Sequence, residues 1–184
     1  VGAYTRSNIP NSYRLGIEIE GSSIITKWLK INGNIAFSEN KILDFTDYYD
    51  DYDEGNQKTN FYSKSDISFS PSIVGSSTLI VNMTKQTQIN LISKYVGRQF
   101  LDNTSRKDRS LNPYFVQDLQ INHQFKLKNL KTTEFIFQLN NIWNKLYEPN
   151  GYTYTYKYEG LIYKNNYYYP MATTNFMIGL NIGF

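Results

Sequence analysis

The feature that most constrains this chain is alternation with a period of two residues. From Tyr13 to Glu20 the odd positions are apolar and the even positions are polar or glycine. Successive side chains of a β-strand point to opposite faces of the sheet. One face of this segment would therefore be apolar, while the other would carry Arg14, Glu18 and Glu20. Such a pattern predicts a strand that lies between an apolar and an aqueous environment.

Similar alternation returns in six further segments, so the chain is expected to be all-β. Most segments are near the ~9–11 residues that a strand needs to cross a bilayer obliquely. About seven strands of this kind predict a portion of a transmembrane antiparallel β-barrel. The segments are 29–38, 79–83, 89–98, 115–127, 135–140 and 176–184.

The alternation also predicts which side chains face lipid and which face the lumen of the barrel. The residues expected to face lipid are Leu15, Ile17, Ile31, Leu119, Ile121, Phe137, Leu180 and Ile182. Those expected to face the lumen are Arg14, Glu18, Asn32, Asp118, Gln120 and Asn181.

The connections alternate between long and short, as they do in bacterial outer-membrane barrels with long extracellular loops and short periplasmic turns. We therefore expect the loops near Asp50, Arg106 and Glu159 outside the cell, and the turns near Lys85 and Asn129 in the periplasm. A soluble barrel or sandwich also alternates and is the alternative, but it has no reason to keep this order of loops. The long connections are 46–70, 101–112 and 145–170, and the short ones are 22–27, 84–87 and 128–131.

Composition excludes several classes of function. The mean hydropathy of −0.51 is polar, but 16% of the residues are aromatic, as expected when one strand face meets lipid and the other meets water. The absence of cysteine excludes disulfides, thiol catalysis and cysteine-ligated zinc. The net charge of +3 is scattered rather than clustered, which argues against a nucleic-acid surface.

No catalytic or metal-binding constellation is evident in the sequence. The single histidine, His123, is expected to be a polar residue at the membrane interface rather than a metal ligand or a base. Glu18 and Glu20 share one face of a strand and are expected to form ion pairs on the wall of the lumen. We therefore expect no enzymatic activity and no cofactor.

Two segments of the long connections could contact a ligand. The acidic stretch 47–54 lacks the order of an EF-hand loop, so we expect a solvated loop, with ligand or cation contact as the alternative. Residues 151–163 have tyrosine at every second position and Glu159-Gly160 as a plausible tip, which predicts a ribbon with four phenol rings on one face. These rings would pack against other loops or stack on a sugar or aromatic ligand. The candidate ligand-binding residues are Tyr49, Asp50, Asp51, Tyr52, Asp53, Tyr152, Tyr154, Tyr156 and Tyr158.

Several segments, in order, resemble the C-terminal barrel of TonB-dependent receptors, especially the version common in Bacteroidota. They are residues 14–21, 69–71, 94–104, 111–119, 140–147 and 175–184. The resemblance implies a barrel of roughly 22 strands with a plug domain in its lumen. Residues 1–184 would supply about seven C-terminal strands, and the plug and the segment that contacts TonB are expected to lie upstream of this chain.

The resemblance also implies a function and a location. The complete protein would import a nutrient (a metal chelate, vitamin, glycan or peptide) across the bacterial outer membrane, powered through TonB. Its partners would be outer-membrane lipid, the remainder of the barrel and the plug, TonB, the barrel-assembly machinery and a surface lipoprotein. The alternative is a structural or adhesive outer-membrane barrel without a role in transport.

The last segment resembles the terminal signal by which such barrels dock on the assembly machinery. Apolar residues occupy its alternate positions, and a free strand edge is a template for pairing. Alternatively, Phe184 only anchors the strand at the membrane interface. The proposed signal residues are Phe176, Ile178, Leu180, Ile182 and Phe184.

Overall fold

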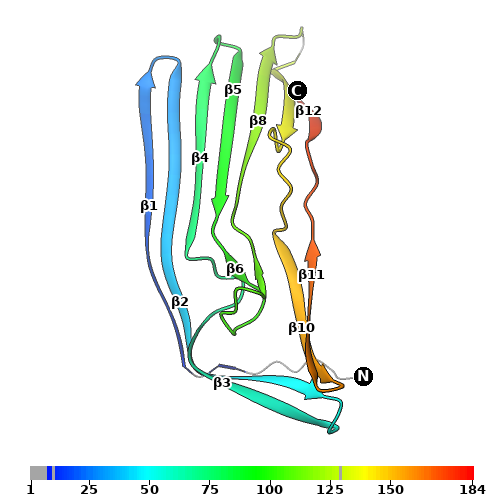
Figure 1. Ribbon diagram of the computed structural model, residues 1–184. Helices are drawn as coiled ribbons and strands as arrows, with labels where there is room; N and C mark the ends of the chain where they lie inside the picture. Colours follow the sequence, from blue (N-terminus) through cyan, green and yellow to red (C-terminus); the bar gives the residue numbers. More distant parts are fainter. Residues whose placement is uncertain (1–7, 10, 129) are drawn as a thin grey trace.

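A computed structural model of the chain describes residues 8, 9, 11–128 and 130–184, and its main feature is one curled antiparallel sheet (Figure 1). Seven strands follow one another across this sheet in the order of the sequence, each hydrogen-bonded to the next. The prediction of about seven strands in an all-β fold is therefore confirmed. The strands are β1 (Ser12–Thr26), β2 (Leu29–Asp51), β4 (Ile73–Asn82), β5 (Thr87–Val96), β8 (Tyr114–Phe125), β9 (Thr132–Asn140) and β12 (Asn175–Gly183).

The register keeps the two faces of the sheet separate across all seven strands. Residues directly opposite each other in neighbouring strands point to the same face. Every residue expected to face lipid lies on one face, and every residue expected to face the lumen lies on the other. We call these the apolar face and the polar face. One row of direct partners on the apolar face is Ile31, Leu79, Leu91, Leu119, Leu139 and Phe176.

Most of the apolar face is open rather than packed under a second layer. The side chains of Leu15 and Ile17 are 69% and 67% exposed, and Ile178 and Leu180 at the other side of the sheet are similarly open. The small buried cluster of Val96, Tyr114 and Val116 lies on the polar face, under Tyr147. A soluble sandwich would bury its apolar face in a core, so this arrangement favours a barrel wall.

The short turns and long connections gather at opposite ends of the sheet (Figure 1). The predicted turn at 22–27 is wrong in its bounds, because Ser22 to Thr26 continue β1 and only Lys27 and Trp28 connect it to β2. The turn after β4 spans 83–86, close to the prediction. The expected turn near Asn129 lies at a position outside the described residues. In the described part of the chain, no helix is long and apolar enough to span a membrane.

Much of the predicted loop 46–70 is in fact strand. Strand β2 runs on to Asp51 and pairs with β3 (Asn56–Asp66) in a long hairpin. At Asp44, φ is 57°, and the pairing with β3 is interrupted at this residue while the register on either side stays the same. The alternation of apolar residues predicts a loop here because the outer half of β2 is polar and interrupts the apolar pattern.

The other two long connections also contain strands. Residues 97–113 include the two-residue strands β6 (Gln99–Phe100) and β7 (Ser110–Leu111), which pair with each other. Residues 145–170 contain the hairpin of β10 (Asn150–Tyr158) and β11 (Leu161–Tyr169). Its tip is Glu159-Gly160, with φ of 50° and 73°, so the predicted ribbon and its tip are confirmed.

Candidate functional site

Three connections meet at the end of the sheet opposite the short turns. They are the β2–β3 hairpin, the loop 97–113 and the β10–β11 hairpin, and together we call them the loop layer (Figure 1). Asp50 and Asp51 of β2 pair in parallel with Tyr156 and Lys157 of β10. The structure therefore brings together the acidic stretch and the tyrosine ribbon, which the sequence presented as separate segments.

The side chain of Asp53 caps the tip of the β10–β11 hairpin. Its Oδ1 accepts a hydrogen bond from the backbone N–H of Glu159 at 2.6 Å, and its Oδ2 accepts one from the N–H of Gly160 at 2.8 Å. Two-residue turns of this geometry need positive φ at both positions, which costs free energy for a residue such as Glu159. The cap supplies charge-assisted hydrogen bonds that help to hold this turn.

A buried ion pair lies one step behind the tip. Lys157 Nζ is 2.9 Å from Asp51 Oδ2 and 3.8 Å from Asp53 Oδ2, and the side chain of Asp51 is fully buried. The hydrogen bond from Lys157 holds the pKa of the Asp51 carboxyl below its usual range, and the same bond raises the pKa of Lys157. Because Asp51 is in the sheet and buried, the expectation of a wholly solvated acidic loop is wrong at this residue.

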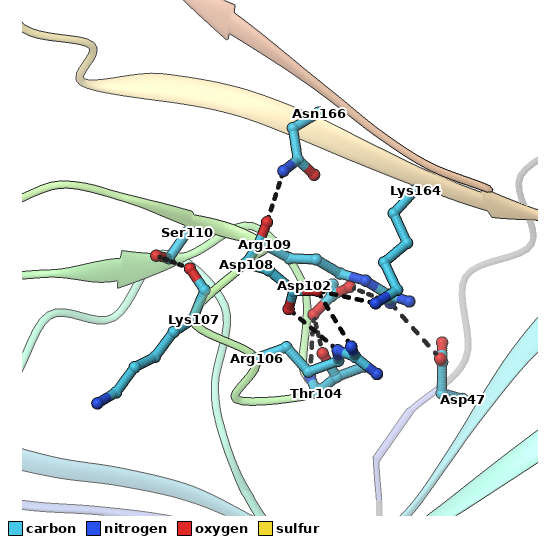
Figure 2. A network of polar contacts seen from close by, with 10 residues as sticks. All are labelled: Asp47, Asp102, Thr104, Arg106, Lys107, Asp108, Arg109, Ser110, Lys164 and Asn166. Atoms are coloured by element: carbon cyan, nitrogen blue, oxygen red, sulfur yellow. Dashed lines mark hydrogen bonds and ion pairs between the residues drawn. The ribbon is translucent and has the colours of Figure 1, made fainter. Parts of the chain in front are cut away.

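The loop 97–113 joins the two hairpins through charged side chains (Figure 2). Arg109 is only 4% exposed and donates to Asp102 Oδ2 at 2.8 Å, with Asp47 Oδ2 3.7 Å away. Burial raises the pKa of the Asp47 carboxyl. Since Asp47 belongs to β2, this cluster ties the loop to the first hairpin.

Asp108 forms the corresponding tie to the second hairpin (Figure 2). It accepts two hydrogen bonds of 3.0 Å from Arg106 and one of 2.9 Å from Lys164 of β11. These cations hold the pKa of Asp108 well below its usual range. Asn166 also donates to the backbone carbonyl of Asp108 at 2.6 Å. Sequence reasoning missed this role, although the density of charge between 102 and 109 could have indicated it.

The two hairpins present one shared aromatic surface, which we call the tyrosine face. In the β10–β11 ladder Tyr152, Tyr154, Tyr156 and Tyr158 lie on the same side, as predicted. The parallel pairing and ring contacts add residues of β2 to that side. The tyrosine face consists of Tyr48, Tyr52, Tyr152, Tyr154, Tyr156, Tyr158, Tyr163 and Tyr167, with Asp50 between them.

Part of the tyrosine face is packed, and part is open. Tyr156 stacks on Tyr163 with ring centroids 5.1 Å apart, and Tyr152 stacks on Tyr167 at 4.8 Å. The hydroxyl groups of Tyr52 and Tyr154 are 3.0 Å apart. Packing between loops, one of the two expectations, is thus observed. The side chains of Tyr48, Tyr52, Tyr152, Tyr154 and Tyr158 remain 40–62% exposed, so ligand contact there stays a prediction.

The candidate residues of the acidic stretch divide according to the alternation of β2. Asp50 and Tyr52 point to the tyrosine face, whereas Tyr49 and Asp51 point to the opposite side. Asp51 and Asp53 use their carboxylates to join the hairpins. In the described residues, no group of three or more His, Cys, Asp or Glu side chains could hold a metal ion.

Two further predicted features lie away from the loop layer. His123 is at the short-turn end of β8, where its Nδ1 is 2.9 Å from Thr87 Oγ1. Four of the proposed signal residues lie on β12 and Phe184 follows it; the only strand partner of β12 within the described ranges is β9. Phe176 stacks against Phe137 on the apolar face, and Phe184 is largely exposed.

A two-faced sheet with long hairpins at one end defines a segment of a β-barrel wall. No protein-family model matches the sequence, and no curated protein matches it. Solved structures do share the fold. The siderophore receptor PiuA from Acinetobacter baumannii aligns with 93% of this chain at a TM-score of 0.68 and 12% identity. The ferric-catecholate import receptor Fiu from E. coli K12 aligns with 92% of this chain, at a TM-score of 0.62 and 15% identity.

A mutant of the ferric enterobactin receptor PfeA from Pseudomonas aeruginosa aligns with 94% of the chain, at a TM-score of 0.59 and 14% identity. The chain spans only 20–22% of the length of these three proteins. At such low identity the likeness concerns the fold. It confirms the expected fold class, a β-barrel portion.

Proposed function

We propose that this chain is part of the wall of an outer-membrane receptor that imports a nutrient. The observation that carries the proposal is the separation of a mainly apolar and a mainly polar face, which the register continues across seven strands. A wall between lipid and a water-filled lumen needs this separation, together with closed backbone hydrogen bonding between strands.

Amide side chains on the polar face support a hydrated lumen. Asn90 Nδ2 donates to Gln120 Oε1 at 3.0 Å, Gln138 Nε2 donates to Asn140 Oδ1 at 2.7 Å, and Asn140 Nδ2 donates to Asn175 Oδ1 at 2.9 Å. Amides bind water without carrying charge, so they suit a surface that polar solutes pass. They would be costly if they faced hydrocarbon.

The resemblance in sequence and the shared fold of three import receptors support the same proposal. The complete protein would be a TonB-dependent receptor of the Bacteroidota type, with no enzymatic activity. A plug, TonB, outer-membrane lipid, the assembly machinery and a surface lipoprotein would be its partners. The cargo would be a metal chelate, vitamin, glycan or peptide. The loop layer would lie outside the cell, with ligand contacts from the exposed members of the candidate set.

Membrane topology can be tested with single cysteines, because the chain has none of its own. Lys107→Cys and Glu159→Cys lie in exposed parts of the loop layer, and Lys85→Cys lies in a short turn. In the complete protein on intact cells, an impermeant maleimide should label the first two variants and not the third. Labelling of Lys85→Cys alone would show the opposite orientation, with the short turns outside the cell.

Transport itself needs a test on cells. Cells with and without the complete reading frame should differ in uptake of labelled ferric chelates, cobalamin, oligosaccharides or oligopeptides, and a protonophore should abolish that difference. Surface binding without energy-dependent uptake of any probe would contradict import and support the structural or adhesive alternative.

A further inference from the structure

The tyrosine face has a geometry of its own that import does not explain. Alternate residues of a strand are about 6.6–6.8 Å apart, so the four tyrosines of β10 form a row along it. Tyr48 of β2 and Tyr52, which follows β2 directly, widen this row into a two-hairpin surface. The rings lie side by side on a sheet rather than around a point. Such a surface fits an extended ligand better than a compact one.

The charges around the tyrosine face limit the class of ligand. The lysines of the two hairpins turn to the opposite side, because Lys58 is the direct partner of Tyr49, Lys157 of Asp51, and Lys164 of Thr155. No lysine or arginine lies on this face between residues 46 and 61 or between 150 and 169. An anionic chelate or a phosphate would need such cations.

One carboxylate lies among the rings. Asp50 accepts hydrogen bonds from Tyr154 at 3.2 Å and from Gln57 at 3.1 Å, so it further disfavours anions and leaves lone pairs for hydroxyl donors. A cationic ligand would favour rings that enclose it, which a row of rings along one side of the strands does not provide.

We propose that the tyrosine face binds the chain of a neutral polysaccharide. The faces of the phenol rings carry partial negative charge and attract the electropositive C–H faces of sugar rings. The phenol hydroxyls and Asp50 can exchange hydrogen bonds with sugar hydroxyls. The extended row of rings suits successive sugars of one chain.

The ties within the loop layer prepare this surface before a ligand arrives. Asp53 holds the tip of the β10–β11 hairpin, and Lys157 joins that hairpin to β2. Tyrosine side chains also lose little conformational entropy on binding, since they have only two rotatable angles. A surface ordered in advance binds with less loss of free energy.

The test uses the complete protein, purified in detergent micelles, in native gels that contain dextran, soluble starch or galactomannan. At least one of these polysaccharides should retard the protein. The double variant Tyr48→Ala with Tyr158→Ala should weaken that retardation about thirtyfold, because each of the two rings contributes on the order of 1 kcal/mol. The single variant Tyr158→Phe should keep most of the binding, since it keeps the ring.

Tyr168→Ala is the matched control. Tyr168 belongs to the same hairpin and is 44% exposed, against 48% for Tyr158, but it pairs with Gly151 on the opposite face. This variant should bind like the unmodified protein. Heat-dependent mobility in SDS gels would check that every variant is folded.

Three results would overturn the proposal: no retardation by any of the three polysaccharides, equal loss in Tyr168→Ala and in the double variant, or tight binding of an anionic ferric tricatecholate at these same tyrosines. The proposal depends on the proposed function only for the location of the face outside the cell. Binding is measured on purified protein, so its failure is distinct from a failure of energy-dependent uptake on cells.

Discussion

At the scale of single residues, the loop layer depends on a few carboxylates that were candidates for ligand binding. Asp51 and Asp53 reach the β10–β11 hairpin from a position more than a hundred residues earlier in the chain. A carboxylate in an exposed loop is free to meet a ligand, but one buried against a lysine is not, because removing its partner leaves a buried charge. The carboxylates of Asp51 and Asp53 are therefore already occupied by contacts within the protein.

The pairing of Asp51 with Lys157 predicts a dependence on pH. The folded-state pKa of Asp51 is lowered, so its contribution to stability is present above the ordinary value of 3.8 and is lost as pH falls below it. The pKa of Lys157 is raised, so its contribution is lost only as pH rises above 10.5. The protection factors for hydrogen exchange at Tyr156 to Gly160, which correct for the intrinsic effect of pH on exchange, should be high between these limits and lower in acid.

Asp51→Asn should remove the acid dependence of the protection factors and lower them at neutral pH. Asn keeps the size of the side chain but leaves the charge of Lys157 without its buried partner. Glu134→Gln, on β9 and away from the loop layer, is a control that should leave exchange at the tip unchanged. An unaltered acid response in Asp51→Asn would refute this role of the pair.

The tip of the hairpin gives a second prediction at the residue scale. Gly160 has a φ of 73°, which an L-residue with a Cβ adopts at a cost, so Gly160→Ala should destabilise the turn by about 1 kcal/mol. Glu159→Gly should have the opposite sign, because it relieves the positive φ of Glu159. Protease resistance of the hairpin would measure both. If both substitutions changed the stability of the hairpin in the same direction, the assigned turn geometry would be wrong.

At the scale of the strands, the register decides the properties of the wall. Ile121 and Gln120 are neighbours in β8 and point to opposite faces. Arginine on a lipid-facing position near the bilayer midplane costs about 2–4 kcal/mol, whereas arginine facing the lumen stays hydrated. The same side chain should therefore have very different effects at two adjacent positions.

We expect Ile121→Arg to destabilise the protein folded in lipid vesicles by about 2–4 kcal/mol and Gln120→Arg to destabilise it by much less. Part of the smaller effect would come from the lost amide contacts of Gln120 with Asn90 and Gln138. Urea titration of the complete protein in vesicles would measure both. Equal tolerance of the two arginines would contradict the assignment of lipid to the apolar face.

At the scale of the whole molecule, the two ends of the sheet have different tasks. The loop layer lies at one end, while Phe184 ends the chain beyond β12 at the other (Figure 1). This separation predicts that changes at Phe184 affect assembly without affecting ligand contacts. If Phe184 belongs to a signal for the assembly machinery, its deletion should lower the amount of inserted protein several-fold.

Ligand affinity of the inserted molecules should be unchanged by that deletion, since a full strand length lies between Phe184 and the loop layer. Quantitative immunoblots of outer-membrane fractions and binding assays on intact cells would measure the two quantities. Phe184→Tyr, which keeps an aromatic end, serves as the control. A normal amount of inserted protein after the deletion would show that Phe184 is only an anchor at the membrane interface.

The sequence by itself determined the two faces of the sheet, the approximate number of strands and the tip at Glu159-Gly160. These features are local, because alternation has a period of two residues and a tight turn needs only its own two central residues. Only the tertiary structure decided that Asp44 takes a positive φ within β2, that Asp50 and Asp51 pair with β10, and that Asp51 and Arg109 are buried. Those outcomes depend on contacts between residues far apart in the chain, and side-chain periodicity carries no information about which distant segments will meet.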